Sequence, residues 1–375
     1  MKVLFLANIP SPYRVDFFQE LGKLCELTVL YELEKASDRN EAWESRVKDK
    51  SYHEIFLKPV IRQTSSAWCP SVEKHLRDRT YDIIVVGVYS TPTGMQAVRY
   101  LKKHKIPYFI NCDGGIISYG ERSFKKRLKT YLIGGAEGYL STGAASDEYL
   151  IYYGAEREKI YRYPFTSLSE KDIAERPLTM EEKESLRETL DISDRKMIIT
   201  VGNFIPRKGF DILLRAAGLM TQDYGIYIVG GEETEEYRSI RTSLGLKNIH
   251  YVPFMEKEKL LKYYRAADLF VLPTREDIWG LVINEAMAAG LPVITTERCV
   301  AGVEMLEREF VIPVENEQIL AERITSLLEN EEALMKAAMN NLSKSREYTI
   351  ENMAKEHLRI FYENTVLRDA GSGGY

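Results

Sequence analysis

Short apolar runs alternate with longer amphipathic stretches along nearly the whole chain, and no other feature of the sequence constrains the fold as strongly. This alternation is typical of strands and helices in a parallel, doubly wound sheet. The runs are rich in Val, Ile and Leu, which indicates strands covered on both faces. We therefore predict an α/β fold with strands at 2–8, 26–31, 81–87, 107–112, 138–142, 196–203, 225–231, 248–254, 268–273 and 291–296.

The pattern is interrupted by a polar, highly charged segment around 166–194 that contains Pro177 and ends in a lead-in helix. We predict one Rossmann-like domain at 1–168 and a second at 169–347. Residues 348–375 are expected to form a C-terminal helix that packs back toward the first domain and ends in a disordered tail from Gly371. The two domains are expected to face each other across a cleft, because loops beyond the carboxyl ends of parallel strands bind ligands there.

The composition is that of an ordinary globular protein, with 45% hydrophobic and 29% charged residues among 375. A formal net charge of -5 provides no overall basic field for binding nucleic acid. No stretch approaches the roughly 20 apolar residues that span a bilayer, so we expect any action at a membrane to occur from its surface. The cysteines form no Cys-x-x-Cys pair, which predicts neither a zinc site nor a disulfide framework and fits a reducing cytosol.

The strongest chemical signal lies at 273–296, where a strand leads through a polar loop and Gly280 into a helix. The backbone N–H groups of Gly280, Leu281 and Val282 form an anion site at the helix start. Asp277 and Glu285 would repel an anion at close range. We therefore expect these carboxylates to accept hydrogen bonds from hydroxyl groups on either side of a phosphate, which is the layout of a sugar nucleotide.

A second strand, loop and helix unit at 201–214 presents Arg207 and Lys208 directly before Gly209. Two cations match a diphosphate leaving group, and their contacts strengthen as that group gains charge. The chain has no Asp-x-Asp motif of the kind that holds a divalent ion against a nucleotide diphosphate, and its histidines show no metal-ligand spacing. These features predict leaving-group catalysis with no metal and no other cofactor.

The unit RKG at 207–209, the carboxylates Asp277 and Glu285 and the phrase NEAMAAGLPVI resemble the family-4 retaining glycosyltransferases of the GT-B fold. The resemblance covers the second half of the chain, with a weaker echo at 141–165. It implies that Glu285 binds the ribose, that Asp277 contacts the transferred sugar and that the two cations hold the diphosphate. The further donor-binding residues that it implies, with 252–255 flanking the base, are Gly202, Asn203, Val252, Phe254, Met255, Gly280, Leu281 and Val282.

The sequence departs from the family pattern at several positions. Asp277 replaces the first carboxylate of a Glu-x7-Glu motif and is one methylene shorter, which leaves the donor sugar open. Asn203 stands where many members have Arg, so we expect Arg207 to take over that charge. The usual glycine-rich loop after the first strand is replaced by PSPYR at 10–14. The family commonly has His where Asp113 stands here.

Three strand ends of the first half, at 11–14, 89–91 and 113–115, are expected to converge on an acceptor site. Asp113 would orient or deprotonate an acceptor hydroxyl or hydrogen-bond the donor sugar, and the alternative is that it merely caps the turn before Gly114. Tyr13, Arg14, Tyr89 and Gly114 complete the predicted acceptor site. The resemblance implies a front-side reaction in which the leaving phosphate takes the acceptor proton, so no covalent nucleophile is nominated.

Residues 121–132, ERSFKKRLKTYL, combine basic side chains with an apolar side. Such a helix can lie on anionic lipid, although the alternative is an ordinary solvated face. We expect a cytoplasmic enzyme, peripheral on the inner face of the cell membrane, that works in polysaccharide biosynthesis of the cell envelope.

The predicted function is retaining, metal-independent transfer of a hexose-type residue from a nucleotide diphosphate sugar. The donor is expected to be a UDP-hexose or UDP-N-acetylhexosamine, and the acceptor a hydroxyl of a lipid-linked or surface glycan. The catalytic residues would be Asp113, Arg207, Lys208 and Asp277. Two alternatives stay open: a nucleotide-sugar 2-epimerase of related fold, and a non-catalytic nucleotide-sugar-binding scaffold. The absence of a full Gly-x-Gly-x-x-Gly fingerprint argues against a dinucleotide oxidoreductase.

Overall fold

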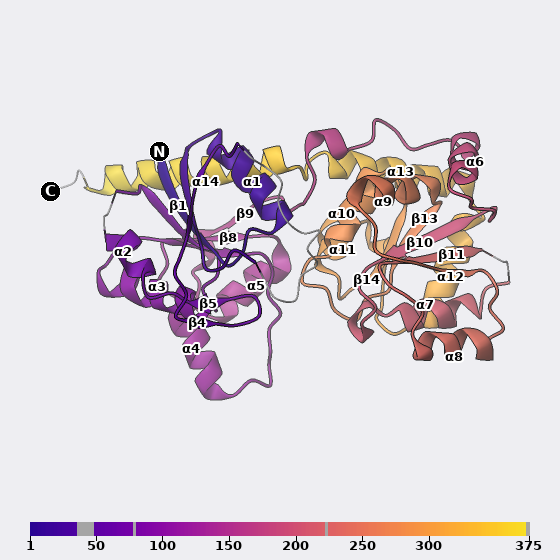
Figure 1. Ribbon diagram of the computed structural model, residues 1–375, viewed down its shortest axis with the longest axis horizontal. Coiled ribbons are helices and arrows are strands. Elements are labelled where there is room, and N and C mark those ends of the chain that lie inside the picture. The colour runs from indigo at the N-terminus through magenta and orange to yellow at the C-terminus, as the bar shows by residue number, and fades with distance from the viewer. Residues whose placement is uncertain (36–48, 78–79, 222–223, 373–375) are drawn as a thin grey trace. The chain divides into compact units, whose positions relative to one another are not determined.

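The computed structural model describes residues 1–35, 49–77, 80–221 and 224–372. The chain divides into two compact units, each described here by itself (Figure 1). Unit 1 comprises Met1–Ser167 together with Thr349–Tyr375, and unit 2 comprises Leu168–Tyr348. The predicted α/β class is confirmed, because each unit is built on a parallel sheet.

The main sheet of unit 1 has the strand order β3-β2-β1-β6-β7-β8-β9, and its neighbouring strands pair in parallel. Val, Ile, Leu and Phe side chains fill its central strands, which are almost fully buried. A separate two-stranded antiparallel ribbon joins β4 to β5. The strands of unit 1 are β1 (Lys2–Ala7), β2 (Glu26–Tyr31), β3 (His53–Phe56), β4 (Ile61–Arg62), β5 (Ala67–Trp68), β6 (Ile83–Val86), β7 (Phe109–Cys112), β8 (Gly138–Ser141) and β9 (Ile160–Arg162).

Helices cover both faces of this sheet, with α1 and α14 on one side and α2 and α3 on the other (Figure 1). The helix α4 projects from the rest of the unit and buries only its last two residues, Leu132 and Ile133. The helices of unit 1 are α1 (Pro12–Gly22), α2 (Val72–Arg77), α3 (Pro92–Lys103), α4 (Ser123–Ile133), α5 (Ala144–Tyr152) and α14 (Ile350–Ser372).

The helix α14 belongs to unit 1 although it comes last in the chain, because it packs against α1. His357 and Phe361 on α14 are fully buried, and Phe361 meets Phe109 of β7 edge to face at 5.8 Å between ring centroids. Gly371 and Ser372 are still helical, whereas the sequence predicts a disordered tail from Gly371. The rest of that predicted tail, 373–375, lies outside the described residues.

The sheet of unit 2 has the order β12-β11-β10-β13-β14-β15, again parallel throughout. Its strands are β10 (Met197–Val201), β11 (Gly225–Val229), β12 (Ile249–Val252), β13 (Leu269–Leu272), β14 (Val293–Thr296) and β15 (Val311–Ile312). Its α-helices are α6 (Met180–Thr189), α7 (Phe210–Ala217), α8 (Glu235–Ser243), α9 (Lys257–Ala266), α10 (Leu281–Ala288), α11 (Val300–Met305), α12 (Glu317–Leu328) and α13 (Glu331–Ser345).

The helix α6 is the lead-in helix that the sequence predicts before the second domain. Thr179 and Glu182 form a capping box at its start. Further along, Arg187 donates to the buried carboxylate of Asp268 at 2.6 Å, and the amide of Met197 donates to the same carboxylate at 2.8 Å. This buried ion pair anchors α6 beside the first residue of β10.

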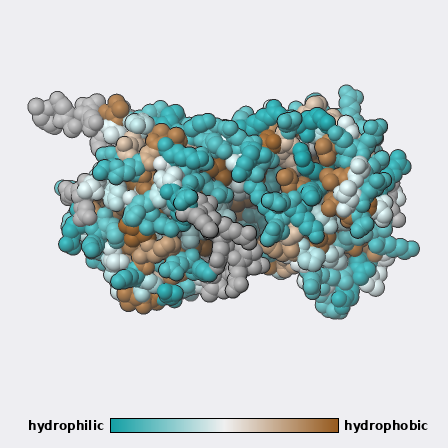
Figure 2. Space-filling model, turned by 45° about the horizontal axis from the view of Figure 1, so that its top comes forward, coloured by the Kyte–Doolittle hydropathy of each residue, from teal (hydrophilic) through white to brown (hydrophobic). Residues whose placement is uncertain are grey.

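Figure 2 shows one face of the molecule, on which hydrophilic residues predominate and apolar residues gather only in small groups. Among the described residues, no helix is both long and apolar enough to cross a membrane. The four cysteines are free thiols, and all except Cys25 are buried.

Candidate active site

In unit 2 the predicted donor residues lie in loops that follow neighbouring parallel strands. β10 pairs directly with β13, so the loops at 202–209 and 273–280 leave the sheet at the same edge. The loop after β12 leaves the same edge, because β12, β11 and β10 are adjacent and parallel. Parallel topology alone therefore gathers these segments at one edge of the sheet.

Gly209 allows the loop after β10 to pass against the end of β13. Its φ is 69°, in the left-handed region that L side chains rarely adopt. A Cβ at this position would lie 2.0 Å from the carbonyl oxygen of Pro273. The close approach lets Thr274 and Arg275 both donate to the carbonyl of Arg207, each at 2.8 Å.

This contact brings the predicted cations onto the predicted sugar-binding carboxylate. The Nζ of Lys208 lies 2.5 Å from Oδ2 of Asp277, and both side chains are about one-eighth exposed (12%). Arg207 lies on the more open side, with NH1 3.5 Å from Oδ1 of Asp277 and 2.8 Å from the carbonyl of Glu276. A single carboxylate thus holds two cations in place.

Arg275 is a structural residue of this site that the sequence reasoning missed. Its guanidinium makes two parallel bonds of 2.8 Å to the carboxylate of Asp211 at the start of α7, and it donates to the carbonyl of Pro206 at 2.6 Å. Although burial opposes the effect, Arg275 holds the pKa of Asp211 below its usual range. The only sequence signal was an Arg among the acids that follow β13, with no hint of its partner.

Gly280 ends the same loop and begins α10. Its φ of 100° is left-handed, and a Cβ there would lie 2.8 Å from the Sγ of the buried Cys299. The carbonyl of Gly280 accepts from the amide of Ile283 at 2.8 Å. The amides of Leu281 and Val282 are the first of α10, which are the groups that a helix offers to an anion.

Glu285 lies one turn into α10, where its carboxylate is half-buried. It accepts a hydrogen bond of 3.0 Å from the hydroxyl of Tyr264, a fully buried side chain of α9. Burial raises the pKa of Glu285, and the bond from Tyr264 only partly opposes that effect. Among the described residues, no hydrogen bond or ion pair joins Glu285 to Lys208 or Asp277. The carboxylate is therefore a separate, desolvated acceptor.

The remaining donor-binding predictions fall on the same edge of the sheet. Gly202 leaves room for the side chain of Lys208, because a Cβ at that glycine would lie 3.3 Å from the Cε of Lys208. Asn203 is exposed. Val252 ends β12, and beyond it Phe254 is 56% exposed and Met255 half-buried. An exposed aromatic ring is the kind of group against which a nucleotide base stacks.

In unit 1 a half-buried polar cluster surrounds Asp113, and it includes Arg14 of the predicted acceptor residues. The Oδ2 of Asp113 is ion-paired with Arg14 of α1. Its Oδ1 accepts a hydrogen bond of 2.7 Å from the hydroxyl of Tyr163 and a further hydrogen bond from the side-chain amide of Asn111. Arg14 is buried, and burial lowers its pKa. Asp113 and the neighbouring Tyr13 and Tyr163 together raise that pKa by more, so the net shift is upward. The structure therefore joins Arg14 to Asp113 directly.

The other acceptor predictions surround this cluster. The ring of Tyr13 meets Phe165 edge to face at 5.8 Å. Gly114 has a φ of 144°, and Tyr89 donates to the hydroxyl of Tyr149 at 3.2 Å. Tyr89 and Tyr149 therefore lie beside the loop that follows Asp113, because a Cβ on Gly115 would meet the Tyr149 ring at 2.4 Å.

His357 of α14 is a second residue that the sequence reasoning missed. Its ring centroid lies 4.4 Å from that of Tyr163 and 4.7 Å from that of Phe17, and its Nδ1 lies 2.8 Å from the carbonyl oxygen of Met353. Burial lowers the pKa of His357 to about 4, so the ring is neutral near pH 7. Its Nε2 is buried with no hydrogen-bond partner among the described residues.

Among the described residues, no group of three His, Cys, Asp or Glu side chains is arranged to hold a metal ion.

Comparison with known proteins relates the chain to a family and to solved structures. Residues 182–347, nearly all of unit 2, match the family described as glycosyl transferases group 1. The match places this segment, residues 182–347, in that family. The likeness to family-4 glycosyltransferases predicted from the RKG unit and the spaced carboxylates is thereby confirmed.

Individual relatives of the chain are distant in sequence. An uncharacterized glycosyltransferase of Haemophilus influenzae is 28% identical over 44% of the chain and 48% of its own length. An N,N'-diacetylbacillosaminyl-diphospho-undecaprenol alpha-1,3-N-acetylgalactosaminyltransferase of Campylobacter jejuni is 21% identical over 77% of the chain and 78% of its own length. The chain spans about half the length of the first curated relatives it matches.

The chain also shares its fold with solved structures. HepE of Anabaena in complex with UDP superimposes with a TM-score of 0.78 at 18% identity, covering 97% of this chain and 100% of that one. WaaG, a glycosyltransferase involved in lipopolysaccharide biosynthesis, gives a TM-score of 0.64 at 16% identity over 96% and 99%. Two Rossmann-like sheets in one chain are therefore the GT-B fold that the resemblance implied.

Proposed function

We propose that this chain is a retaining glycosyltransferase that moves a sugar from a nucleotide diphosphate sugar to a hydroxyl of a lipid-linked or surface polysaccharide. The donor is a UDP-hexose or UDP-N-acetylhexosamine, and the acceptor belongs to the cell envelope. The observation that carries the proposal is the ion pair of Lys208 and Asp277 beside the first turn of α10. Cations, a carboxylate and free helix amides at one edge of the sheet are what a diphosphate joined to a sugar requires.

Each group of unit 2 has a distinct part in this reaction. Lys208, Arg207 and the amides of Leu281 and Val282 bind the diphosphate, and their attraction grows as the bond from the sugar C1 to the phosphate oxygen breaks. Asp277 keeps Lys208 oriented and accepts a hydrogen bond from a hydroxyl of the transferred sugar. Glu285, one turn further along α10, accepts from the ribose hydroxyls. The exposed ring of Phe254, with Val252 and Met255, flanks the base.

Unit 1 binds the acceptor through the cluster of Asp113. A carboxylate offers about four acceptor positions. Arg14, Asn111 and Tyr163 occupy three of those on Asp113, which leaves room for one hydroxyl of the acceptor. Asp113 therefore orients that hydroxyl. As the hydroxyl oxygen bonds to C1 on the face that the nucleotide leaves, its proton passes to the departing phosphate oxygen.

The helix α4 holds the enzyme on the inner face of the membrane. Phe124 is 75% exposed near its start, and the neighbouring Lys125 is exposed beside it. An exposed ring among lysines binds anionic lipid by partial burial of the ring and by charge. Cosedimentation with phosphatidylglycerol vesicles tests this, since Phe124→Ser/Lys125→Glu should abolish binding, and undiminished binding would contradict it.

A thermal-shift panel of UDP-, GDP- and ADP-sugars tests the donor site. A ligand at about 100 times its dissociation constant stabilises the folded state by about 2.7 kcal/mol, so one class of nucleotide sugar should shift the transition of unit 2. Lys208→Ala and Glu285→Ala should each abolish that shift. If no nucleotide sugar shifts the transition, or if the shift persists in both variants, the proposed site is wrong.

Product analysis with and without a glycan acceptor separates the three activities. A transferase forms a new glycoside only with acceptor, and the product keeps the anomeric configuration of the donor. A 2-epimerase releases UDP without acceptor, and a scaffold binds the nucleotide sugar without turning it over. Release of an epimerised sugar would therefore replace this proposal with the epimerase.

A further inference from the structure

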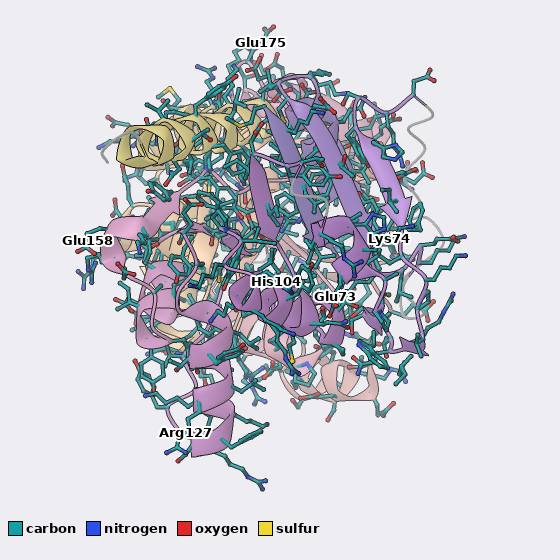
Figure 3. The ribbon with its side chains drawn as sticks, turned by 90° about the vertical axis from the view of Figure 1, so that its left-hand side faces the viewer. Glu73, Lys74, His104, Arg127, Glu158 and Glu175 are labelled. Atoms are coloured by element: carbon teal, nitrogen blue, oxygen red, sulfur yellow. The ribbon has the colours of Figure 1, made fainter. Side chains whose placement is uncertain are left out.

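A cavity of about 610 Å³ lies beside α4, and neither Asp113 nor Arg14 lines it. We call it the α4 cavity and define it by its lining residues, which are Tyr119, Glu121, Ser123, Lys126, Arg127, Thr130, Tyr131 and Tyr152. Its volume falls within the range of sites that bind small molecules. Figure 3 shows Arg127 on the projecting part of α4.

One side of α4 supplies the polar lining of the α4 cavity. Ser123, Lys126, Arg127 and Thr130 follow a spacing of three and four residues, which places them on the same side of a helix. Glu121 does not cancel their charge, because it is paired with Lys129 at 2.9 Å and accepts from the hydroxyl of Tyr153. Among the described residues Arg127 has no ion-pair partner. The cavity therefore keeps two positive charges, which favour an anion.

Tyrosine rings supply the rest of the lining. Tyr119 is 80% exposed and Tyr131 48% exposed, while Tyr119 meets Tyr152 edge to face at 5.7 Å. The Nζ of Lys126 lies 3.9 Å from the centroid of the Tyr152 ring, so that ring fixes the cation against the wall. Exposed tyrosine faces pack on the apolar C–H faces of a sugar ring, and their hydroxyls bind its polar groups.

A row of tyrosines in contact links the wall of the α4 cavity to Tyr89 of the proposed acceptor site. Tyr89 is hydrogen-bonded to Tyr149, whose ring centroid lies 4.8 Å from that of Tyr153. The Tyr153 ring in turn lies 4.9 Å from Tyr152 in the cavity wall. In the sequence, the segment 113–122 leads from Asp113 through Tyr119 to the start of α4.

We propose that the α4 cavity is a second acceptor subsite, which binds an anionic sugar residue of the growing glycan at a distance from the reacting hydroxyl. Lys126 and Arg127 bind a phosphate or carboxylate group of that residue, and Tyr119, Tyr131 and Tyr152 pack on its ring. This subsite rests on the proposed function for its biological meaning. Its binding chemistry is independent of the donor site and is tested separately.

Saturation-transfer NMR of the full chain in saturating UDP tests this subsite. The probes are N-acetylglucosamine 1-phosphate, N-acetylglucosamine, inorganic phosphate and phosphatidylglycerol vesicles, and UDP keeps the phosphosugar out of unit 2. We expect N-acetylglucosamine 1-phosphate to bind at least tenfold more tightly than either fragment. Lys126→Gln/Arg127→Gln and Tyr119→Ala should each weaken it tenfold or more. The charge-matched control Lys74→Gln/Lys103→Gln, exposed on α2 and α3 outside the cavity, should bind like the unchanged protein.

Each other outcome overturns the subsite. Inorganic phosphate that binds as tightly as the phosphosugar would make this an anion site without sugar recognition. Unchanged phosphosugar binding in Lys126→Gln/Arg127→Gln, with loss of vesicle binding in the same variant, would make the cavity part of a lipid-binding surface. The thermal shift with UDP-sugars is measured on the same variants, so failure of the donor site is recorded independently of the subsite.

Discussion

Lys208 and Asp277 form an ion pair of 2.5 Å between two loops that follow adjacent strands, and neither side chain is more than about one-eighth exposed (12%). In the proposed reaction the cation serves the diphosphate and the carboxylate serves the sugar. Because they pair without a ligand, the Lys208 side chain is already ordered before the donor binds. Donor binding therefore does not have to supply the conformational entropy lost in ordering Lys208.

Removal of Lys208 should therefore damage both stability and binding. Lys208→Met leaves the carboxylate of Asp277 poorly compensated, and we expect a loss of about 1–3 kcal/mol in the free energy of unfolding of unit 2. Lys208→Met/Asp277→Asn should recover most of that loss and still give no thermal shift with any nucleotide sugar. Urea unfolding and thermal shift check this, and a single variant as stable as the unchanged protein would contradict the coupling.

Glu285 should make stability fall as pH rises. Burial raises its pKa in the folded state, so its contribution is fully present below the unfolded value and is lost as pH rises through the folded value. Glu285→Gln should therefore raise the melting temperature at pH 8 more than at pH 4.5. The same variant should bind the nucleotide sugar about tenfold more weakly, because a charged acceptor of the ribose hydroxyls is lost. A variant less stable at pH 8 would contradict this account.

His357 should make unit 1 sensitive to acid. Its pKa falls to about 4 in the folded state, so its contribution is present above the unfolded value near 6.5 and is lost as pH falls toward 4. A shift of this size corresponds to about 3 kcal/mol. The groups that face it carry opposite effects, since Arg14 lowers its pKa and Asp113 raises it.

Replacement of His357 by Phe should remove this acid sensitivity. Urea unfolding of the unchanged chain and of His357→Phe at pH 7.5 and 4.5 measures it. Equal loss of stability in both proteins over this range would show that other groups, not His357, dominate the acid response.

The central strands could be predicted because a strand that is buried on both faces is a nearly continuous run of apolar residues in the sequence. β10 and β13 are continuous apolar runs, and every predicted run contains a strand. The strands β9 and β15 were missed because they have only three and two residues. The strand β3 was missed because it lies at an edge of the unit 1 sheet, where part-exposed residues replace the apolar run. The ribbon of β4 and β5 is shorter still, with two residues in each strand.

Only one part of the site could be predicted, which is that loops following adjacent parallel strands lie close together. The adjacency of β10 and β13 accounts for the meeting of Lys208 with Asp277, which the motifs had anticipated as residues of one site. The surroundings of Asp113 were not predictable. Tyr163, which donates to it, and His357, which packs on Tyr163, come from distant segments, and the periodicity of a segment indicates which face is buried but not what packs against that face. Arg275 was missed for the same reason.

Arg275 provides the sharpest test of how the donor site is held together. In the described part of the chain, its side chain contacts none of the predicted donor-binding residues, although its backbone amide donates to the carbonyl of Arg207. The hydrogen bonds from its guanidinium to Asp211 and to the carbonyl of Pro206 fix the turn that carries Lys208. Arg275→Lys keeps the charge but loses the paired, planar contact, so Lys208 should become less ordered. We expect nucleotide-sugar affinity to fall about tenfold, at roughly 1.4 kcal/mol, while the free energy of unfolding changes less than in Lys208→Met. Arg215→Lys, on the same helix as Asp211, is the matched control, and equal losses of affinity in both variants would contradict a positioning role for Arg275.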